Sequence, residues 1–131
     1  MAPLIDTHVW IWWLTRLTRL SSRIIAALDE MQERPVLSVA SLWELSLLVE
    51  SGRVELRPTA AAWLEQAIRP ETVRLAQITR AVALELFAFP KEFRRDPADR
   101  IIVATARALD VPLLTYDQGI RKAGLVKIWK P

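Results

Sequence analysis

The chain has no cysteine and only one histidine, His8. The absence of cysteine excludes disulfides, thiolate metal sites and cysteine nucleophiles, and it is compatible with the reducing cytoplasm, where we expect this protein to act. A single histidine excludes a ribonuclease that works through a histidine pair. The sequence also contains neither Gly-x-Gly-x-x-Gly, nor a Walker A loop, nor His-Glu-x-x-His, so the usual nucleotide-binding and zinc motifs are missing.

Long hydrophobic runs are missing as well. The run at residues 9–14 has six residues, whereas a helix that spans a bilayer needs about 20. No basic segment precedes this run at the N-terminus, so we expect no secretory signal. The sequence therefore predicts a soluble protein that is not bound to a membrane.

The composition is that of a well-packed protein with an arginine-rich surface. The chain has 131 residues, of which 52% are hydrophobic, and we expect one domain spanning residues 1–131. Its net charge is +3, and only four of its 18 basic residues are lysine. Arginine suits phosphate recognition. This balance fits a nucleic-acid enzyme and equally an ordinary soluble surface.

Short apolar segments alternate with helical patterns along the chain. This alternation predicts an α/β fold with a central parallel sheet of about 4–5 short strands flanked by helices. The predicted strands are 3–5, 36–39, 73–75, 112–115 and 126–128, with 54–56 as a minor strand or extended linker. The predicted helices are 8–14, 21–34, 41–50, 59–69, 79–87, 96–109 and a short one ending near residue 122.

Four acidic residues occur near the predicted strand ends. Asp6 and Asp117 each follow an apolar strand, and Glu44 lies on the helix after another strand. Asp99 lies in the first turn of a helix. Because open α/β sheets bind ligands beyond the carboxyl ends of their strands, we expect these side chains to meet at one rim.

Carboxylates held that close repel one another and raise each other's pKa values. A divalent cation removes this repulsion, and Mg²⁺ or Mn²⁺ prefers oxygen ligands of this kind. Such an ion lowers the pKa of a bound water and so supplies a nucleophile without a protein base. The acids therefore favour metal-dependent phosphodiester chemistry.

Each acid also has a structural interpretation. Asp6 and Asp117 are both placed to cap the helices that follow them, and Glu44 stands early in a helix, where an acid favours the helix dipole. Asp96 and Asp99 have the spacing of a capping box. We interpret Asp96 mainly as a cap and Asp99 as a member of the site.

Four segments resemble the motifs of PIN-domain proteins, specifically the VapC-type toxins of bacterial toxin–antitoxin pairs. They are Leu4–Trp10, Ser38–Leu45, Arg95–Ala106 and Leu113–Asp117, and they follow one another in the family's order over essentially the whole chain. The Asp-Pro-x-Asp-Arg sequence within the third segment is the most specific of these matches.

The resemblance implies a PIN-like fold, Mg²⁺- or Mn²⁺-dependent cleavage of RNA, a homodimer and inhibition by a cognate antitoxin. It maps the catalytic and metal-binding acids onto Asp6, Glu44, Asp99 and Asp117. Thr115 matches a supporting position near the site. Arg94 stands where many relatives have histidine, a departure that affects how substrate is held and leaves the metal ligands unchanged.

Basic and aromatic residues surround the motifs. Arg94, Arg95 and Arg100 could each contact RNA phosphates or neutralise the acids through salt bridges. We favour the first role for Arg94 and Arg95, which lie in a loop, and the second for Arg100. His8 is interpreted as a structural or surface residue.

Trp10, Trp12 and Trp13 lie on one short helix, on which adjacent residues diverge by about 100°. One or two of them therefore belong to the core. We expect the remainder of this Trp-rich helix to contact a dimer mate or the antitoxin.

Three other functions compete with the nuclease. A haloacid dehalogenase-like phosphatase needs a second aspartate two residues after Asp6, where His8 stands. A phosphoacceptor receiver domain needs an early pair of acids, which is missing. The alternative that remains is a catalytically silent PIN-like domain that binds RNA or a protein partner, and the presence of all four acids favours the enzyme.

Overall fold

The computed structural model describes residues 1–17 and 19–131 and has an α/β architecture. Its sheet has four strands in the order β3-β2-β1-β4, and every neighbouring pair is parallel. The strands are β1 (Leu4–Ile5), β2 (Val36–Ser38), β3 (Arg74–Ala76) and β4 (Leu113–Leu114). The predicted parallel sheet is confirmed.

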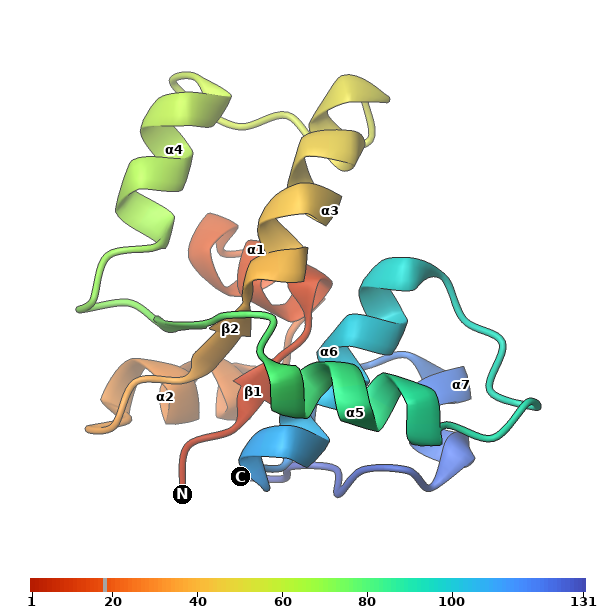
Figure 1. Cartoon of the computed structure of the whole chain (residues 1–131). Helices are drawn as coiled ribbons and strands as arrows, with labels where there is room; N and C mark the ends of the chain where they lie inside the picture. The colour runs from red at the N-terminus through yellow and green to blue at the C-terminus, as the bar shows by residue number, and fades with distance from the viewer. Residues whose placement is uncertain (18) are drawn as a thin grey trace.

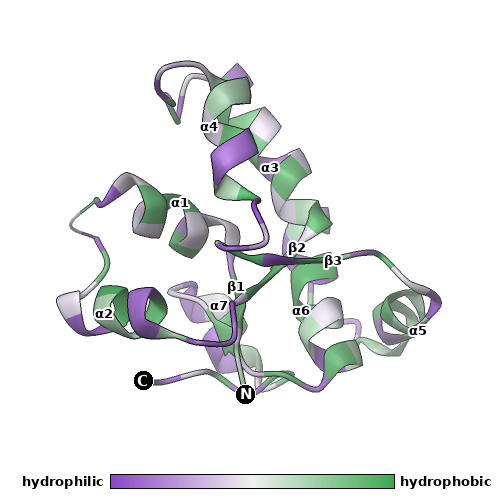
Figure 2. Cartoon of the chain, turned by 90° about the vertical axis from the view of Figure 1, so that its left-hand side faces the viewer, coloured by the Kyte–Doolittle hydropathy of each residue, from purple (hydrophilic) through white to green (hydrophobic). Residues whose placement is uncertain are grey.

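Helices connect and cover these strands, as Figure 1 shows. They are α1 (Thr7–Thr15), α2 (Ser22–Glu30), α3 (Val39–Glu50), α4 (Ala60–Ala67), α5 (Arg80–Ala88), α6 (Pro97–Leu109) and α7 (Gln118–Ala123). In Figure 2, α1 and α2 lie on one side of the strands and α5 and α6 on the other. Among the described residues, no helix is both long and apolar enough to cross a membrane.

The sheet has a hydrophobic core on each face, because successive side chains of a strand point to opposite sides. Ile5, Leu37 and Leu114 belong to a cluster with residues of α1, α2 and α4. Leu4, Val36 and Leu113 belong to a second cluster with residues of α6 and α7. Leu4 pairs with both Val36 and Leu113, so the register aligns each core across three strands.

Two predicted elements differ from the structure. Of the predicted strand 126–128 only Ile128 forms an isolated bridge, to Leu113. Residues 54–56 form no strand, which leaves the extended linker of the two alternatives. The helix predicted at 21–34 ends at Glu30, and Met31 has an extended backbone. Because Pro35 disfavours helical geometry in the residue before it, the last turn of the predicted helix could not form at Arg34.

Two of the three tryptophans of α1 are core residues, as the sequence predicted. Trp10 is fully buried, and its indole N–H donates to the Ala67 carbonyl at 3.1 Å. Trp13 is buried as well and donates to Asp29 Oδ1 at 2.9 Å. Trp12 is only half-buried, because its position on the helix turns it away from this core.

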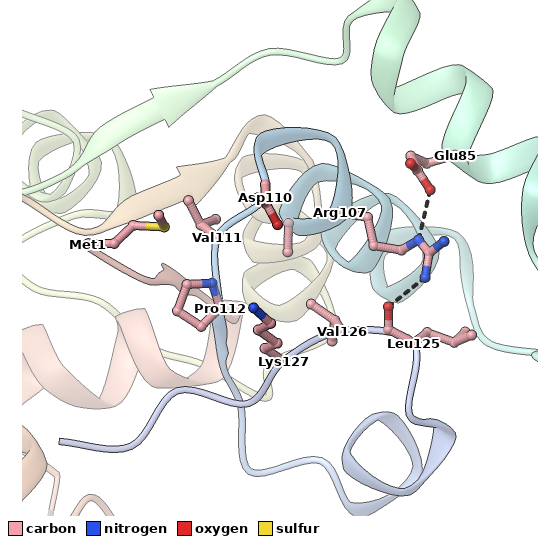
Figure 3. A pocket seen from close by; sticks show the side chains of 10 residues that line it. Met1, Glu85, Arg107, Asp110, Val111, Pro112, Leu125, Val126 and Lys127 are labelled. Carbon is pink, nitrogen blue, oxygen red and sulfur yellow. Dashed lines mark hydrogen bonds and ion pairs between the residues drawn. The ribbon is translucent and has the colours of Figure 1, made fainter.

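An arginine holds three segments together at the edge of the sheet where the strands begin (Figure 3). Arg107, in the last turn of α6, donates from Nε to Glu85 Oε2 of α5 at 2.7 Å. Its Nη1 donates to the Leu125 carbonyl at 2.6 Å. The three residues line a hollow of about 360 Å³, and their contacts attach both α5 and the C-terminal segment to α6.

We expect Arg107→Met to lower the free energy of unfolding by about 1–2 kcal/mol, since methionine keeps the aliphatic stem but loses both partly exposed charge-assisted bonds. Urea unfolding followed by circular dichroism measures this. Arg53→Met, at an exposed arginine, is the matched control. An Arg107→Met midpoint equal to that of the control would contradict the role of this residue.

Candidate active site

A cleft of about 430 Å³ lies at the opposite edge of the sheet, where β1 and β4 end. We call it the acid cleft, and it contains all four acids that the sequence singled out. Its lining is Asp6, His8, Val9, Trp12, Arg19, Glu44, Arg95, Asp96, Asp99, Tyr116 and Asp117. The structure therefore brings together residues that are up to 111 positions apart in sequence, from Asp6 to Asp117.

Asp6 is fixed through both oxygens of its carboxylate. It caps α1 directly after β1 and accepts from the Thr7 amide at Oδ1, at 2.8 Å. Its Oδ2 accepts from the Thr115 hydroxyl at 2.6 Å. Burial raises the pKa of Asp6, and these two hydrogen bonds oppose the rise. A buried carboxylate that is oriented at both oxygens is a rigid ligand for a cation.

Thr115 connects two of the acids. Its side chain is fully buried, donates to Asp6 and accepts from the Asp117 amide at 3.1 Å. The hydroxyl group thus positions the end of β1 relative to the start of α7. The sequence singled out Thr115 only through resemblance, and the structure gives this residue a physical role.

Glu44 projects from α3 with one oxygen that has no partner. The hydroxyls of Thr7 and Ser41 lie 2.7 Å apart and tie α1 to α3 beside it. Among the described residues, Glu44 Oε1 is the buried side-chain oxygen without a hydrogen bond. Burial raises the pKa of Glu44, and the nearby Thr7 hydroxyl opposes the rise. A buried oxygen of this kind carries a desolvation cost that a bound cation would remove.

Asp96 and Asp99 lie in the same turn at the start of α6. Asp96 caps the helix by accepting from the Asp99 amide at 2.9 Å. Carboxylate oxygens of Glu44, Asp96 and Asp99 all lie within 4.8 Å of one another. Burial, followed by the charges of Asp96 and Asp6, raises the pKa of Asp99 to about 7. Asp96 is therefore both a cap and part of the acid cluster, whereas the sequence assigned it mainly to the cap.

Arg95 is the cation that lies among these acids. Its Nε and Nη2 donate to Asp99 Oδ2 at 3.2 and 3.0 Å, and Nη2 also donates to Asp117 Oδ2. Gly119 leaves room for this arrangement, because a Cβ at that position would collide with the Arg95 guanidinium. Asp117 itself caps α7 by accepting from the Ile120 amide at 3.0 Å.

The sequence assigned the arginines differently. Arg100 was expected to neutralise the acids, but its Nη1 donates to the Phe93 carbonyl at 2.9 Å, and its guanidinium lies 5.5 Å from the centre of the Phe89 ring. Arg100 points away because it follows Asp99 directly, about 100° further round the helix. Arg94 is exposed and donates to the Lys91 carbonyl.

The donor set of the acid cleft suits a hard divalent cation. Five carboxylates face two arginines and one histidine in its lining, and oxygen is the ligand that Mg²⁺ and Mn²⁺ prefer. Sequence reasoning favoured RNA contact over acid pairing for Arg95, and it missed the aromatic side of the cleft, which includes Trp12 and Tyr116. It also assigned Asp96 mainly to the helix cap, although the i, i+3 spacing of Asp96 and Asp99 was the signal that both lie in one helical turn.

Solved structures with a similar fold include a toxin–antitoxin complex. The crystal structure of VapBC2 from Rickettsia felis bound to a DNA fragment from their promoter matches at a TM-score of 0.73, with 12% identity over 98% of each chain. FitAcB from Neisseria gonorrhoeae matches at 0.69, with 27% identity over 98% of this chain and 96% of that one. A toxin–antitoxin complex from Klebsiella pneumoniae matches at 0.66, with 17% identity over 95% of both.

Sequence comparison agrees with the fold. Ribonuclease VapC22 of Mycobacterium tuberculosis is 38% identical over 118 residues, which cover 90% of this chain and 88% of the relative. The PIN domain family model matches residues 4–125, a range that contains every acid of the cleft. By fold, family model and sequence identity, the chain belongs to the PIN-domain family and is of the VapC type.

Proposed function

We propose that this protein is a Mg²⁺- or Mn²⁺-dependent endoribonuclease with Asp6, Glu44, Asp99 and Asp117 as its catalytic and metal-binding residues. The observation that carries the proposal is the convergence of these carboxylates in one cleft, with the pKa values of Asp6, Glu44 and Asp99 raised. The similarity to a relative named as a ribonuclease supports RNA as the substrate.

The residues of the cleft have different roles in this mechanism. A bound divalent ion would supply an activated water and a positive charge at the phosphate. Asp6 is oriented for this ion by Thr115 and by the Thr7 amide, and Glu44 offers its unpartnered buried Oε1. Asp99 and Asp117 become available when Arg95 releases them. Arg94 and Arg95 then stand beside the cleft as cations for the RNA backbone.

The same proposal extends to the biological setting. We propose a toxin that acts on RNA in the cytoplasm, forms a homodimer and is inhibited by a cognate antitoxin. The similar fold of the toxin–antitoxin complex from Klebsiella pneumoniae supports an antitoxin as partner. The chain would act as one nuclease domain over residues 1–131.

RNA cleavage tests the proposal directly. We expect the wild-type protein to cleave RNA with Mg²⁺ or Mn²⁺, and we expect EDTA to abolish this cleavage. Asp99→Asn should reduce the rate by about a hundredfold or more, because it removes an essential charge at the metal. The matched control is Asp110→Asn, at the other end of α6, where the left-handed backbone suits asparagine.

Two results would count against this function. Cleavage that persists in EDTA and in Asp99→Asn would reject the metal mechanism. RNA binding without any cleavage by the wild-type protein would favour the catalytically silent PIN-like domain instead.

The raised pKa of Asp99 predicts how stability depends on pH without metal. Between about pH 4 and 7 the folded protein retains a proton that the unfolded chain has released, so the free energy of unfolding falls as pH rises through this window. In EDTA we therefore expect the melting temperature to drop towards pH 8. Asp99→Asn should weaken this dependence while Asp110→Asn preserves it, and identical profiles for all three proteins would refute the effect.

Arg95 competes with a metal ion for the same carboxylates, which can be measured without RNA. We expect Arg95→Gln to bind Mn²⁺ about tenfold more tightly in calorimetry, because a charge-assisted contact no longer has to break. Arg94→Gln is the neighbouring control. Weaker Mn²⁺ binding by Arg95→Gln would mean that Arg95 organises the acids for the ion.

A further inference from the structure

One side of the acid cleft is built from aromatic rings that the metal chemistry does not need. The rings of Trp12 and Tyr116 lie with their centroids 5.8 Å apart at an interplanar angle of 87°. The His8 ring also lies near Trp12, with the two centroids 5.6 Å apart. All three residues line the cleft. We call Tyr116, Trp12 and His8 the aromatic wall.

The aromatic wall comes from the same two segments as two of the acids. His8 and Trp12 are on α1, which Asp6 caps, and Tyr116 lies between Thr115 and Asp117. The backbone at Tyr116 is fixed on both sides, because Thr115 is fully buried and accepts from the Asp117 amide. The ring therefore has a defined position relative to the acids.

Tyr116 is exposed although its surroundings are rigid. Its exposed fraction is 37%, whereas the neighbouring Thr115 is completely buried. The perpendicular contact with Trp12 braces the ring in one orientation, and such edge-to-face pairs are favourable. A braced and accessible ring can bind a planar group with little loss of side-chain freedom.

A positive charge accompanies these rings. The guanidinium carbon of Arg19 lies 5.6 Å from the centre of the Trp12 ring, and Arg19 is exposed in the lining of the acid cleft. A cation beside an aromatic surface suits a ligand that alternates charged phosphates with flat bases. Acids that would hold a metal ion are continuous with this surface.

We propose that Tyr116, braced by Trp12, is the surface on which a nucleobase next to the scissile phosphate stacks, with Arg19 contacting the adjoining backbone. This inference rests on the proposed ribonuclease function. Stacking needs a base whose face is free, so the Tyr116 ring, which we call the stacking platform, selects an unpaired nucleotide over one inside a duplex. Tyr116 is then a specificity-determining residue, and Trp12 is a positioning residue that acts through it.

A binding experiment tests the platform without turnover. Asp99→Asn serves as the parent protein, with Mg²⁺ present, and the probe is a fluorescent single-stranded RNA of roughly 12 nucleotides. Adding Tyr116→Ala should weaken binding in anisotropy titrations by about tenfold or more, because stacking on one ring contributes that much. Tyr116→Phe keeps the ring and should stay within about twofold of the parent. Trp43→Ala removes another exposed aromatic, outside the cleft, and is the matched control.

A second measurement separates stacking from a structural effect. After the cleavage position is mapped with wild-type protein, the probe is made abasic beside that position. Loss of the base and Tyr116→Ala should then not add, since both remove the same contact. In cleavage assays Trp12→Phe should raise KM more than it lowers kcat.

Three outcomes would overturn the inference. They are equal binding by the parent and Tyr116→Ala, additive losses with the abasic probe, and a duplex bound as tightly as the single strand. If wild-type protein cleaves RNA and Tyr116→Ala binds RNA as Trp43→Ala does, the stacking inference is wrong although the proposed ribonuclease function is supported. The aromatic wall would then fit a protein side chain better than a nucleobase. If the wild-type protein neither binds nor cleaves RNA, the proposed function fails together with the platform.

Discussion

The repulsion among carboxylates that meet at one rim of the sheet is the constraint on which the rest of the site depends. Three of these acids, Asp6, Asp96 and Asp117, are N-caps of α1, α6 and α7. The start of a helix carries a partial positive charge and unpaired amide groups, so capping partly offsets the repulsion. The same three residues therefore cap helices and contribute carboxylates to the acid cleft.

The fold holds this cluster through contacts between distant segments. Parallel strands bring the ends of β1 and β4 to the same edge, and the register places a core on each face behind them. Thr115 then ties Asp6 to the start of α7, and the Thr7–Ser41 contact ties α1 to α3. Because these links are buried, the acids stay in place, and burial, with a smaller contribution from the neighbouring carboxylates, raises the pKa values of Asp6, Glu44 and Asp99.

Two kinds of chemistry line the same cleft. Glu44, Asp96 and Asp99 form one group, with Arg95 as their counter-ion. The aromatic wall forms the other and presents an accessible ring. A polymer with a charged backbone and planar bases can satisfy both groups at once. Without a metal ion, Arg95 balances the charge of the acids. Its contacts occupy the same carboxylate oxygens that a bound metal ion would use.

The sequence by itself determined the parallel sheet, most of the helix starts and which acids stand at strand ends, because these follow from short-range periodicity and capping. Only the tertiary structure decided which arginine meets the acids. Arg95 reaches Asp99 and Asp117 across the space beside Gly119, whereas Arg100 turns to the Phe93 carbonyl. It likewise placed Trp12 against Tyr116, which lies 104 positions further along the chain. Contacts of this range depend on how helices pack on the sheet, and no local pattern of residues specifies them.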